Sequence, residues 1–244
     1  MVYIDPDRTT NVLLTGSTRG IGAAVMATLR DRPKVRVIGH GRADGPETIG
    51  ADLSQPRAAE ALWAEAERRL GHVDILINNA GVFEANDTFD AHDQWLAGWE
   101  RTMRINLTAA AELCRLAVAR WVARESYEAR IVNVASRAAH RGDSPQHWHY
   151  AASKAGMVAM TKTIARAHAR DGIYAFAVCP GFTMTGMAED YLASRGGDRL
   201  LADIPLGRVA GVEEVANVVR YLALDAPASM TGAVLDINGA SYVR

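Results

Sequence analysis

The sequence predicts a protein of the α/β class, a single domain built around a doubly wound parallel sheet with helices on both faces. Short apolar runs of strand length alternate with longer amphipathic stretches along the chain. The apolar runs are continuous and do not alternate with polar residues, which is typical of strands buried on both faces. No linker, repeat or shift in composition divides the 244 residues. One domain over residues 1–244 is therefore the expected organisation.

The expected strands and helices follow one another in the order that βαβ units require. An apolar strand at 11–15 leads into a helix at 21–30 that ends before Pro33. The second strand is expected at 35–39, and the third ends at Asp52 and Leu53. Further strands are expected at 73–77, 130–135, 173–179 and 234–237, and further helices at 63–70, 99–124, 150–170 and 213–224. Between Gly39 and Asp52 there is no helical periodicity, so that crossover is predicted to be a loop or a single turn. Right-handed crossovers wind such strands into a Rossmann-like sheet.

The composition argues against several classes of protein. The chain has 27 Lys and Arg against 28 Asp and Glu, a net charge of -1, which is not the balance of a nucleic-acid binder. No apolar run approaches the roughly 18 residues of a membrane span, and no signal peptide pattern opens the chain. Cys114 and Cys179 do not form the cysteine pattern of a secreted disulfide framework. We therefore expect a cytoplasmic protein without nucleic-acid or membrane partners.

A glycine-rich turn follows the first strand and opens the first helix. Glycines at such a turn let the backbone approach a pyrophosphate, and the free N–H groups of the helix start attract its charge. The glycine spacing of 16, 20 and 22 differs from the G-x-G-x-x-G form, and a plain surface turn is the alternative. The residues predicted to contact a dinucleotide here are Gly16, Ser17, Thr18, Arg19, Gly20, Ile21 and Gly22.

Three motifs and a later dipeptide occur in a family-specific order. They are TGSTRGIG from Thr15, NNAG from Asn78, YAASK from Tyr150, and Pro180-Gly181. This set resembles the short-chain dehydrogenase/reductase family over nearly the whole chain. The last part of the chain further resembles the branch that contains 3-oxoacyl carrier-protein reductases. The resemblance implies a nicotinamide-dependent oxidoreductase.

Charge near the end of the second strand predicts which nicotinamide cofactor is used. An acidic residue there would bind the ribose hydroxyls of NAD and repel a 2′-phosphate. The chain instead places Arg42 there, with no carboxylate before Asp44, and Arg19 lies in the glycine turn. Because arginine binds phosphate in a bidentate manner, the pair favours NADP, with NAD as the alternative.

The resemblance implies further cofactor contacts. Asp52 and Leu53 match residues that cap the adenine ring, although Asp52 equally suits the N-terminal cap region of the next helix. Asn78, by contrast, is expected to tie strands together. The other matching positions are Asn79, Ala80 and Gly81, then Pro180, Gly181, Thr183 and Thr185 beside the nicotinamide, and Tyr150 and Lys154.

Tyr150 and Lys154 are four residues apart and share one face of a predicted helix. Hydride transfer at a carbon that bears oxygen needs a proton donor or acceptor at that oxygen. A phenol with a pKa near 10 becomes effective when a nearby ammonium stabilises its anion. Ser136, at the end of a strand, is expected to hold the substrate oxygen. The resemblance adds Asn106, which anchors a water relay to the lysine. The predicted reaction interconverts a ketone and a secondary alcohol, with Tyr150 as general acid/base.

Other residues bear on metals and on the substrate. His140, His147 and His149 lie between Ser136 and Tyr150. They are interpreted as polar loop residues, so no metal site is expected. The stretch from Thr185 to Leu206 matches the family's flexible substrate lid.

The expected partners are a small ketone or alcohol and further copies of this chain. The helix at 99–124 has a second apolar face that needs a partner helix, and the resemblance implies a homotetramer or homodimer paired through it and the helix at 150–170. The carrier-protein reductases present arginines where this chain has Tyr127 and Asp171. That departure counts against a carrier-protein substrate, which stays open as an alternative, as does a non-catalytic NADP-binding regulatory or scaffold protein.

Overall fold

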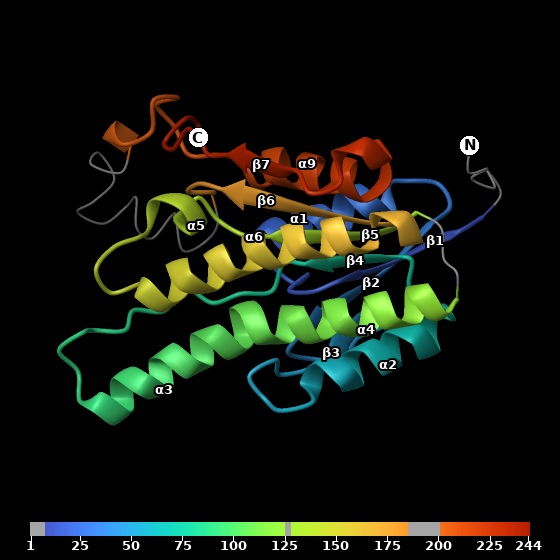
Figure 1. The fold of residues 1–244 in the computed structure, drawn as a ribbon, viewed down its shortest axis with the longest axis horizontal. Helices are drawn as coiled ribbons and strands as arrows, with labels where there is room; N and C mark the ends of the chain where they lie inside the picture. The colour runs from blue at the N-terminus through green and yellow to red at the C-terminus, as the bar shows by residue number, and fades with distance from the viewer. Residues whose placement is uncertain (1–7, 125–127, 185–200) are drawn as a thin grey trace.

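The computed structural model describes residues 8–124, 128–184 and 201–244. These residues include one parallel sheet of seven strands, in the order β3-β2-β1-β4-β5-β6-β7, with helices on both of its faces (Figure 1). The strands are β1 (Thr10–Leu14), β2 (Val35–Gly41), β3 (Thr48–Gly50), β4 (Ile75–Asn78), β5 (Ala129–Val134), β6 (Ile173–Pro180) and β7 (Val234–Ile237). The principal helices are α1 (Gly20–Arg30), α2 (Ala58–Leu70), α3 (His92–Met103), α4 (Ala109–Ala123), α5 (Ala138–Arg141), α6 (Trp148–His168) and α9 (Val212–Leu224). The predicted doubly wound α/β fold is confirmed.

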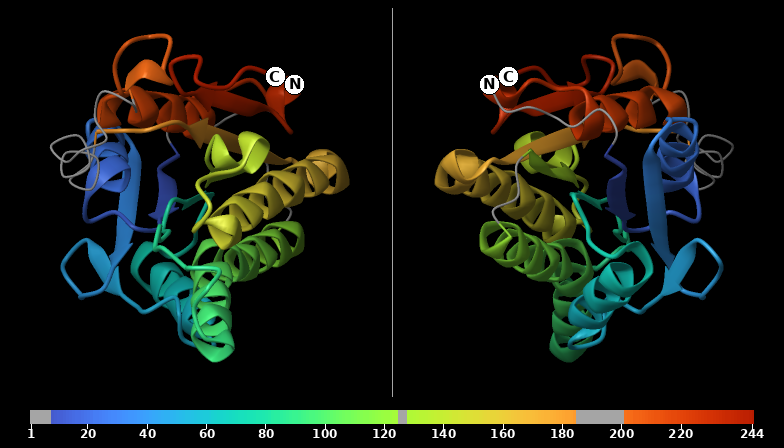
Figure 2. Two further views of the ribbon diagram at one scale, coloured as in Figure 1. Left: turned by 90° about the vertical axis from the view of Figure 1, so that its left-hand side faces the viewer. Right: turned by 90° about the vertical axis from the view of Figure 1, so that its right-hand side faces the viewer.

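Successive residues of each strand pack into two different apolar cores, one on each face of the sheet. Leu13, Leu76 and Ile131 face the core formed with α2, α4 and α6. Val12 and Leu14 face the core formed with α1 and α9. Figure 2 shows the two helical layers on opposite sides of the strands. Burial on both faces explains why the strands read as continuous apolar runs.

Polar groups inside the sheet are paired. Asn78 at the end of β4 donates a hydrogen bond from Nδ2 to Oδ1 of Asn133 on β5, at 2.9 Å. The expected role of Asn78 in tying strands together is confirmed. Asn133 in turn donates from Nδ2 to Oγ1 of Thr161 on α6, at 2.8 Å.

The crossover between β2 and β3 has no helix. Residues 42–47 connect the two strands, and the β2–β3 pairing brings Gly39 beside Thr48 and Gly41 beside Gly50. The prediction of a loop or single turn is confirmed. The absence of a helix leaves the end of β2 close to the glycine turn at the edge where ligands bind in doubly wound sheets.

The long helix predicted at 99–124 begins earlier and is interrupted. Helix α3 starts at His92, and a π-helical segment, η1 (Arg104–Thr108), separates it from α4. Single π-helical turns of this kind often occur at functional sites. In the described part of the chain, no helix combines the length and apolar character needed to cross a membrane.

Candidate active site

The glycine turn between β1 and α1 is shaped for close contact of backbones. Gly16 has a φ of +66, and a Cβ at this position would lie 2.8 Å from the Cα of Ala80. A Cβ at Gly22 would overlap the carbonyl oxygen of Gly16. Larger residues are therefore excluded at both positions. The side chain of Arg19, at the N-cap of α1, makes no capping hydrogen bond, so the first N–H groups of the helix are available to an anionic group.

Hydrogen bonds from the residues after β4 hold this turn in place. Oγ1 of Thr15 accepts hydrogen bonds from the backbone N–H groups of Asn79 and Ala80, each at 3.0 Å. Nδ2 of Asn79 donates to the carbonyl oxygens of Thr15 at 3.1 Å and Gly16 at 2.9 Å. The structure thus brings the predicted residues Asn79 and Ala80 against the glycine turn, and Asn79 also positions that turn.

His40 is a site residue that the sequence did not reveal. It is buried at the end of β2, where Nδ1 accepts a hydrogen bond from Gly16 N–H at 3.2 Å and Nε2 contacts the Ala51 carbonyl at 3.1 Å. The carbonyl of His40 accepts hydrogen bonds from the N–H and hydroxyl of Ser17, at 2.9 and 3.2 Å. Burial lowers the pKa of His40 and favours the neutral ring. The available signal was a histidine between two glycines within a buried strand.

Arg19 and Arg42 extend from the same corner of the molecule. Arg19 follows Thr18 and Arg42 follows Gly41, and a Cβ at Gly41 would lie 2.5 Å from Cγ2 of Thr18. Both arginine side chains are exposed. Within the described ranges neither takes part in an ion pair. This placement suits a phosphate group bound between them.

The two acidic residues near this corner are held by local hydrogen bonds. Asp44 accepts one from the Gly50 N–H at 2.9 Å. Asp52 accepts from the N–H and hydroxyl of Ser54, at 3.0 and 2.7 Å, and these bonds lower the pKa of Asp52. Asp52 thus forms a local turn, and its alternative interpretation as a cap residue is wrong, because α2 begins at Ala58 with Arg57 at its N-cap. Leu53 is buried.

Ser136 and Tyr150 meet beyond the carboxyl end of β5. Ser136 is buried, and its Oγ accepts a hydrogen bond from the Ala138 N–H at 3.1 Å, which supports the start of α5. Burial raises the pKa of Tyr150 to about 12, and a hydrogen bond with the Ser136 side chain opposes this shift. The phenol is therefore protonated at neutral pH and oriented by Ser136.

Lys154 lies one helical turn after Tyr150 and is buried. Its Nζ donates to the carbonyl oxygen of Val134 at 2.9 Å and lies 5.8 Å from the centre of the Tyr150 ring. Burial lowers the pKa of Lys154 to about 8. The net shift of the Tyr150 pKa is upward, because the burial of the phenol outweighs the lowering expected from this ammonium.

Asn106 lies in the π-helical segment and is fully buried. Its Oδ1 accepts a hydrogen bond from the Val82 N–H at 2.8 Å, and its Nδ2 donates to the Val82 carbonyl at 2.9 Å. A Cβ at Gly81 would lie 3.3 Å from Oδ1 of Asn106 and 3.5 Å from Nζ of Lys154. Asn106, Gly81 and Lys154 are therefore neighbours, and the amide anchors the loop after β4.

Further predicted contacts follow β6. A Cβ at Gly181 would lie 2.9 Å from the Cα of Asn238, and the Gly181 N–H donates to the Ile237 carbonyl at 2.9 Å. Thr183 is buried, and its hydroxyl donates to the Gly181 carbonyl at 3.3 Å. Pro180 ends β6. Thr185 and most of the predicted lid lie outside the described residues.

The interpretation of three histidines as polar loop residues is wrong. His147 and His149 are buried, and His140 is half-buried on α5 next to Cys179. The His147 ring stacks on Phe83 with ring centres 3.8 Å apart. Phe83 also contacts Tyr150 edge-on at 4.8 Å. The aromatic wall formed by Phe83 and His147 beside Tyr150 was not predicted, because nothing in the spacing brings residues 83 and 147 together.

The fold and this set of residues define a class of protein. A glycine turn at the end of β1, a serine after β5 and a Tyr-x-x-x-Lys pair on α6 define an oxidoreductase of the short-chain dehydrogenase/reductase class, which acts on CH–OH or keto groups. A family model described as enoyl-(acyl carrier protein) reductase matches residues 17–240. The chain therefore belongs to the short-chain dehydrogenase/reductase family, and the resemblance seen in the sequence is confirmed.

Individual relatives agree with this assignment. The chain is 33% identical over 243 residues to the 3-oxoacyl-(acyl-carrier-protein) reductase FabG of Escherichia coli, covering 95% of this chain and 96% of the relative. It is 32% identical over 243 residues to the acetoacetyl-CoA reductase of Shinella zoogloeoides, covering 94% and 97%. Among solved structures, a putative 2-deoxy-D-gluconate 3-dehydrogenase from Agrobacterium tumefaciens with bound NADP is similar, with a TM-score of 0.85, 25% identity and coverage of 98% and 99%.

Proposed function

We propose that this protein is an NADP(H)-dependent oxidoreductase that interconverts a ketone and a secondary alcohol, with Tyr150 as general acid/base. The observation that carries the proposal is the gathering of Ser136, Tyr150 and Lys154 beyond the carboxyl end of β5. Ligands of doubly wound sheets bind at that end of the strands. We also propose that one domain over residues 1–244 forms this unit.

The side chains supply the proton chemistry. In the direction of reduction, the Ser136 hydroxyl holds the carbonyl oxygen of the substrate, and Oη of Tyr150 donates its proton to that oxygen. The cationic Lys154 stabilises the phenolate that remains. Asn106 fixes the loop that faces Lys154 through its two hydrogen bonds with Val82. In the direction of oxidation, the same phenolate accepts the alcohol proton.

The cofactor residues fit a dinucleotide with a 2′-phosphate. A Cβ at either Gly16 or Gly22 would fill the backbone cradle, which suits close approach of a pyrophosphate. When bound, NADP(H) supplies or accepts the hydride. The exposed Arg19 and Arg42 would hold the 2′-phosphate, while Asp44 is engaged with the Gly50 N–H. The bound NADP in the Agrobacterium structure supports this choice.

The decisive experiment is the Tyr150→Phe variant. Loss of the phenol removes the proton donor, and general acid/base groups typically contribute about 10²–10⁴-fold to rate. We expect kcat for ketone reduction to fall by at least about 10²-fold, with NADPH affinity, measured by fluorescence titration, within twofold of the wild type. Assaying a panel of ketones and alcohols by the change in NADPH absorbance identifies the substrate.

The matched control is Tyr174→Phe on β6, which removes a phenol outside the site and is expected to retain full activity. Robust activity in Tyr150→Phe would refute the assigned role. A wild type that binds NADPH but reduces no member of the panel would instead favour the regulatory or scaffold alternative.

A 3-oxoacyl carrier-protein reductase is the second candidate, favoured by the names of the relatives. Two ion pairs at and near the matching positions argue against a carrier-protein substrate. Asp171, where that branch is expected to present an arginine, pairs with His168 at 2.8 Å, and Arg124 pairs with Asp74 at 3.1 Å. The other matching position, Tyr127, lies outside the described residues. We expect kcat/KM for an acetoacetyl thioester not to rise when coenzyme A is replaced by acyl carrier protein. A rise of tenfold or more would favour the carrier-protein reductase.

A further inference from the structure

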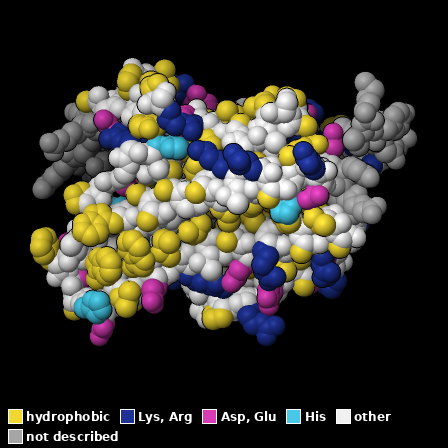
Figure 3. Space-filling view, in the orientation of Figure 1, with side chains coloured by type: hydrophobic (Ala, Val, Ile, Leu, Met, Phe, Trp, Pro, Cys, Tyr) yellow, Lys and Arg dark blue, Asp and Glu magenta, His cyan; other side chains and the backbone are white. Residues whose placement is uncertain are grey.

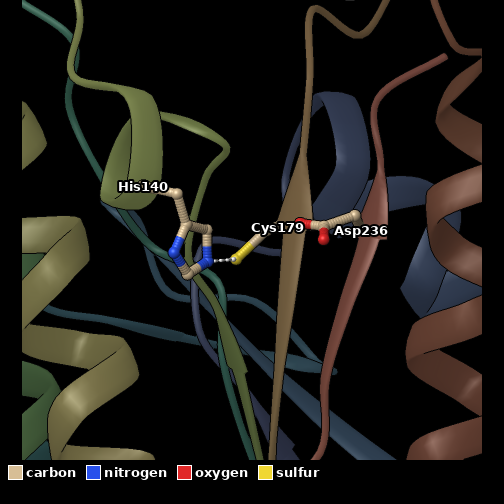
Figure 4. A group of neighbouring side chains, drawn as sticks. All are labelled: His140, Cys179 and Asp236. Atoms are coloured by element: carbon tan, nitrogen blue, oxygen red, sulfur yellow. Dashed lines mark hydrogen bonds between the residues drawn. The ribbon is translucent and has the colours of Figure 1, made fainter. Parts of the chain in front are cut away.

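His140, Cys179 and Asp236 form a cluster that the proposed reaction does not use (Figure 4). Cys179 on β6 and Asp236 on β7 are paired neighbours on adjacent parallel strands. His140 reaches them from α5, and its Nε2 lies 3.6 Å from Sγ of Cys179. One nitrogen, one sulfur and one carboxylate oxygen thus lie within 4.8 Å of one another.

We propose that these three side chains bind a zinc ion, with His140 Nε2, Cys179 Sγ and an oxygen of Asp236 as ligands and water in the fourth position. Zinc prefers a tetrahedral set of nitrogen, sulfur and oxygen ligands. Bond lengths of about 2.3 Å to sulfur and about 2.0–2.1 Å to nitrogen place those two atoms about 3.5 Å apart in a tetrahedron. The observed separation of 3.6 Å between these two atoms is close to this value.

The surroundings restrain two ligands and leave the third adjustable. Cys179 is fully buried within β6, and the His140 ring stacks on Tyr242 with ring centres 5.6 Å apart and planes within 3°. Asp236 is directed toward Cys179 (Figure 4). Arg244 contacts only Oδ2 of Asp236, at 2.9 and 3.0 Å, so Oδ1 faces no such competitor. A carboxylate shift on the order of 1 Å completes the tetrahedron.

Two of the three proposed ligands can supply negative charge to a divalent ion. Arg244 and Lys162 place positive charge near His140, which disfavours a cation, and Asp236 opposes them. Coordination breaks the Sγ–H bond of Cys179, forms an Sγ–zinc bond and releases the proton to solvent. A thiolate and a carboxylate then neutralise the two charges of the ion. His140 enters as a neutral ligand, because imidazole binds a metal through an unprotonated ring nitrogen.

The ion would also connect three elements that border the proposed active site. Helix α5 follows Ser136, Cys179 precedes Pro180, and β7 packs beside β6. A metal at this point would brace the loop that carries Pro180 and Gly181. Without a metal, the His140–Cys179 contact is a weak hydrogen bond between a thiol and an imidazole.

Cobalt(II) titration of the chelator-treated full chain tests the proposal. Cobalt replaces zinc in such sites, and its thiolate complexes absorb in the near ultraviolet, which reports directly on Cys179. We expect one cobalt ion per chain with this thiolate band, displaced by zinc. Cys179→Ala should abolish the band, and His140→Ala and Asp236→Asn should each weaken binding by at least about tenfold.

Matched variants separate ligand loss from structural damage. Cys114→Ala removes the other buried cysteine, which contacts Asn78 in a different apolar cluster, and should keep the band and the affinity. Arg244→Gln frees Asp236 and should tighten cobalt binding, an effect that damage cannot produce. A wild type without the band, or Cys179→Ala with unchanged affinity, overturns the proposal. If Cys179→Ala does not fold, unchanged affinity in Asp236→Asn overturns it.

Discussion

In the proposed reaction, single side chains govern the choice of cofactor and the protonation of the acid/base group. The two exposed arginines beside the glycine turn each follow a residue of one close contact, that of Thr18 with Gly41. A hydrogen bond to a charged group contributes about 1.5–3 kcal/mol, which corresponds to roughly 10- to 100-fold in affinity.

The Arg42→Asp variant should therefore reverse the cofactor preference. The carboxylate repels a 2′-phosphate and accepts hydrogen bonds from ribose hydroxyls. We expect the KM for NADPH to rise by at least about tenfold and the KM for NADH to fall. Steady-state kinetics with both cofactors measures the change, and Arg36→Asp on β2 serves as a charge-matched control. An unchanged preference would contradict the placement of the phosphate.

Lys154 sets a pH limit on reduction. Its pKa is lowered to about 8 by burial, so the side chain is cationic below that pH and neutral above it. The phenol of Tyr150 stays protonated throughout this range, since its pKa is raised to about 12. We expect kcat/KM for reduction to be level below pH 8 and to fall as pH rises through it. A profile that instead rises above pH 8 would assign the titration to another group.

At the scale of elements, the turn between β1 and α1 depends on the absence of side chains. Gly22→Ala would force a Cβ against the Gly16 carbonyl, so either the turn opens or α1 moves. We expect NADPH affinity to fall at least tenfold and stability to fall by about 1–3 kcal/mol, measured by fluorescence titration and urea unfolding. Gly45→Ala is the matched control, because a Cβ there meets only Thr48 at an ordinary 3.8 Å.

The sequence predicted most elements because each is locally consistent. Apolar runs located the strands, and the glycine turn and the Tyr150–Lys154 spacing located two parts of the site. The π-helical segment was not predictable from periodicity, because the amide of Asn106 is satisfied by Val82 on a separate loop. His40 and the His140–Cys179–Asp236 cluster could not be predicted from the sequence either, because their partners are also far away along the chain. Their partners are brought together by sheet pairing and not by spacing along the chain.

At the scale of the whole molecule, apolar side chains gather on one side near α3 and the start of α6, as the hydrophobic side chains in Figure 3 show. Leu96 on α3 is 37% exposed and Trp148 on α6 is 53% exposed. Exposed apolar patches of this kind usually mark an interface between proteins. The patch lies on the same side as the helices that we predicted to pair two copies of the chain.

We expect light scattering to give the mass of two or four chains. Leu96→Glu should shift that equilibrium toward smaller species, because a carboxylate would be buried without a partner. Ala27→Glu introduces the same charge at an exposed position of α1 and should leave the mass unchanged. A monomeric wild type would contradict the predicted assembly.

The bracing of the glycine turn affects the thermodynamics of cofactor binding. Fixing a flexible backbone residue costs about 1–2 kcal/mol of conformational entropy. Here Thr15, Asn79 and His40 already fix the turn through side chains of the surrounding strands and loops. That ordering is completed when the protein folds, so a nucleotide meets a preorganised surface and loses little affinity to loop closure. Calorimetry should accordingly give a modest entropic penalty for NADPH binding, which would grow in variants that remove the imidazole of His40.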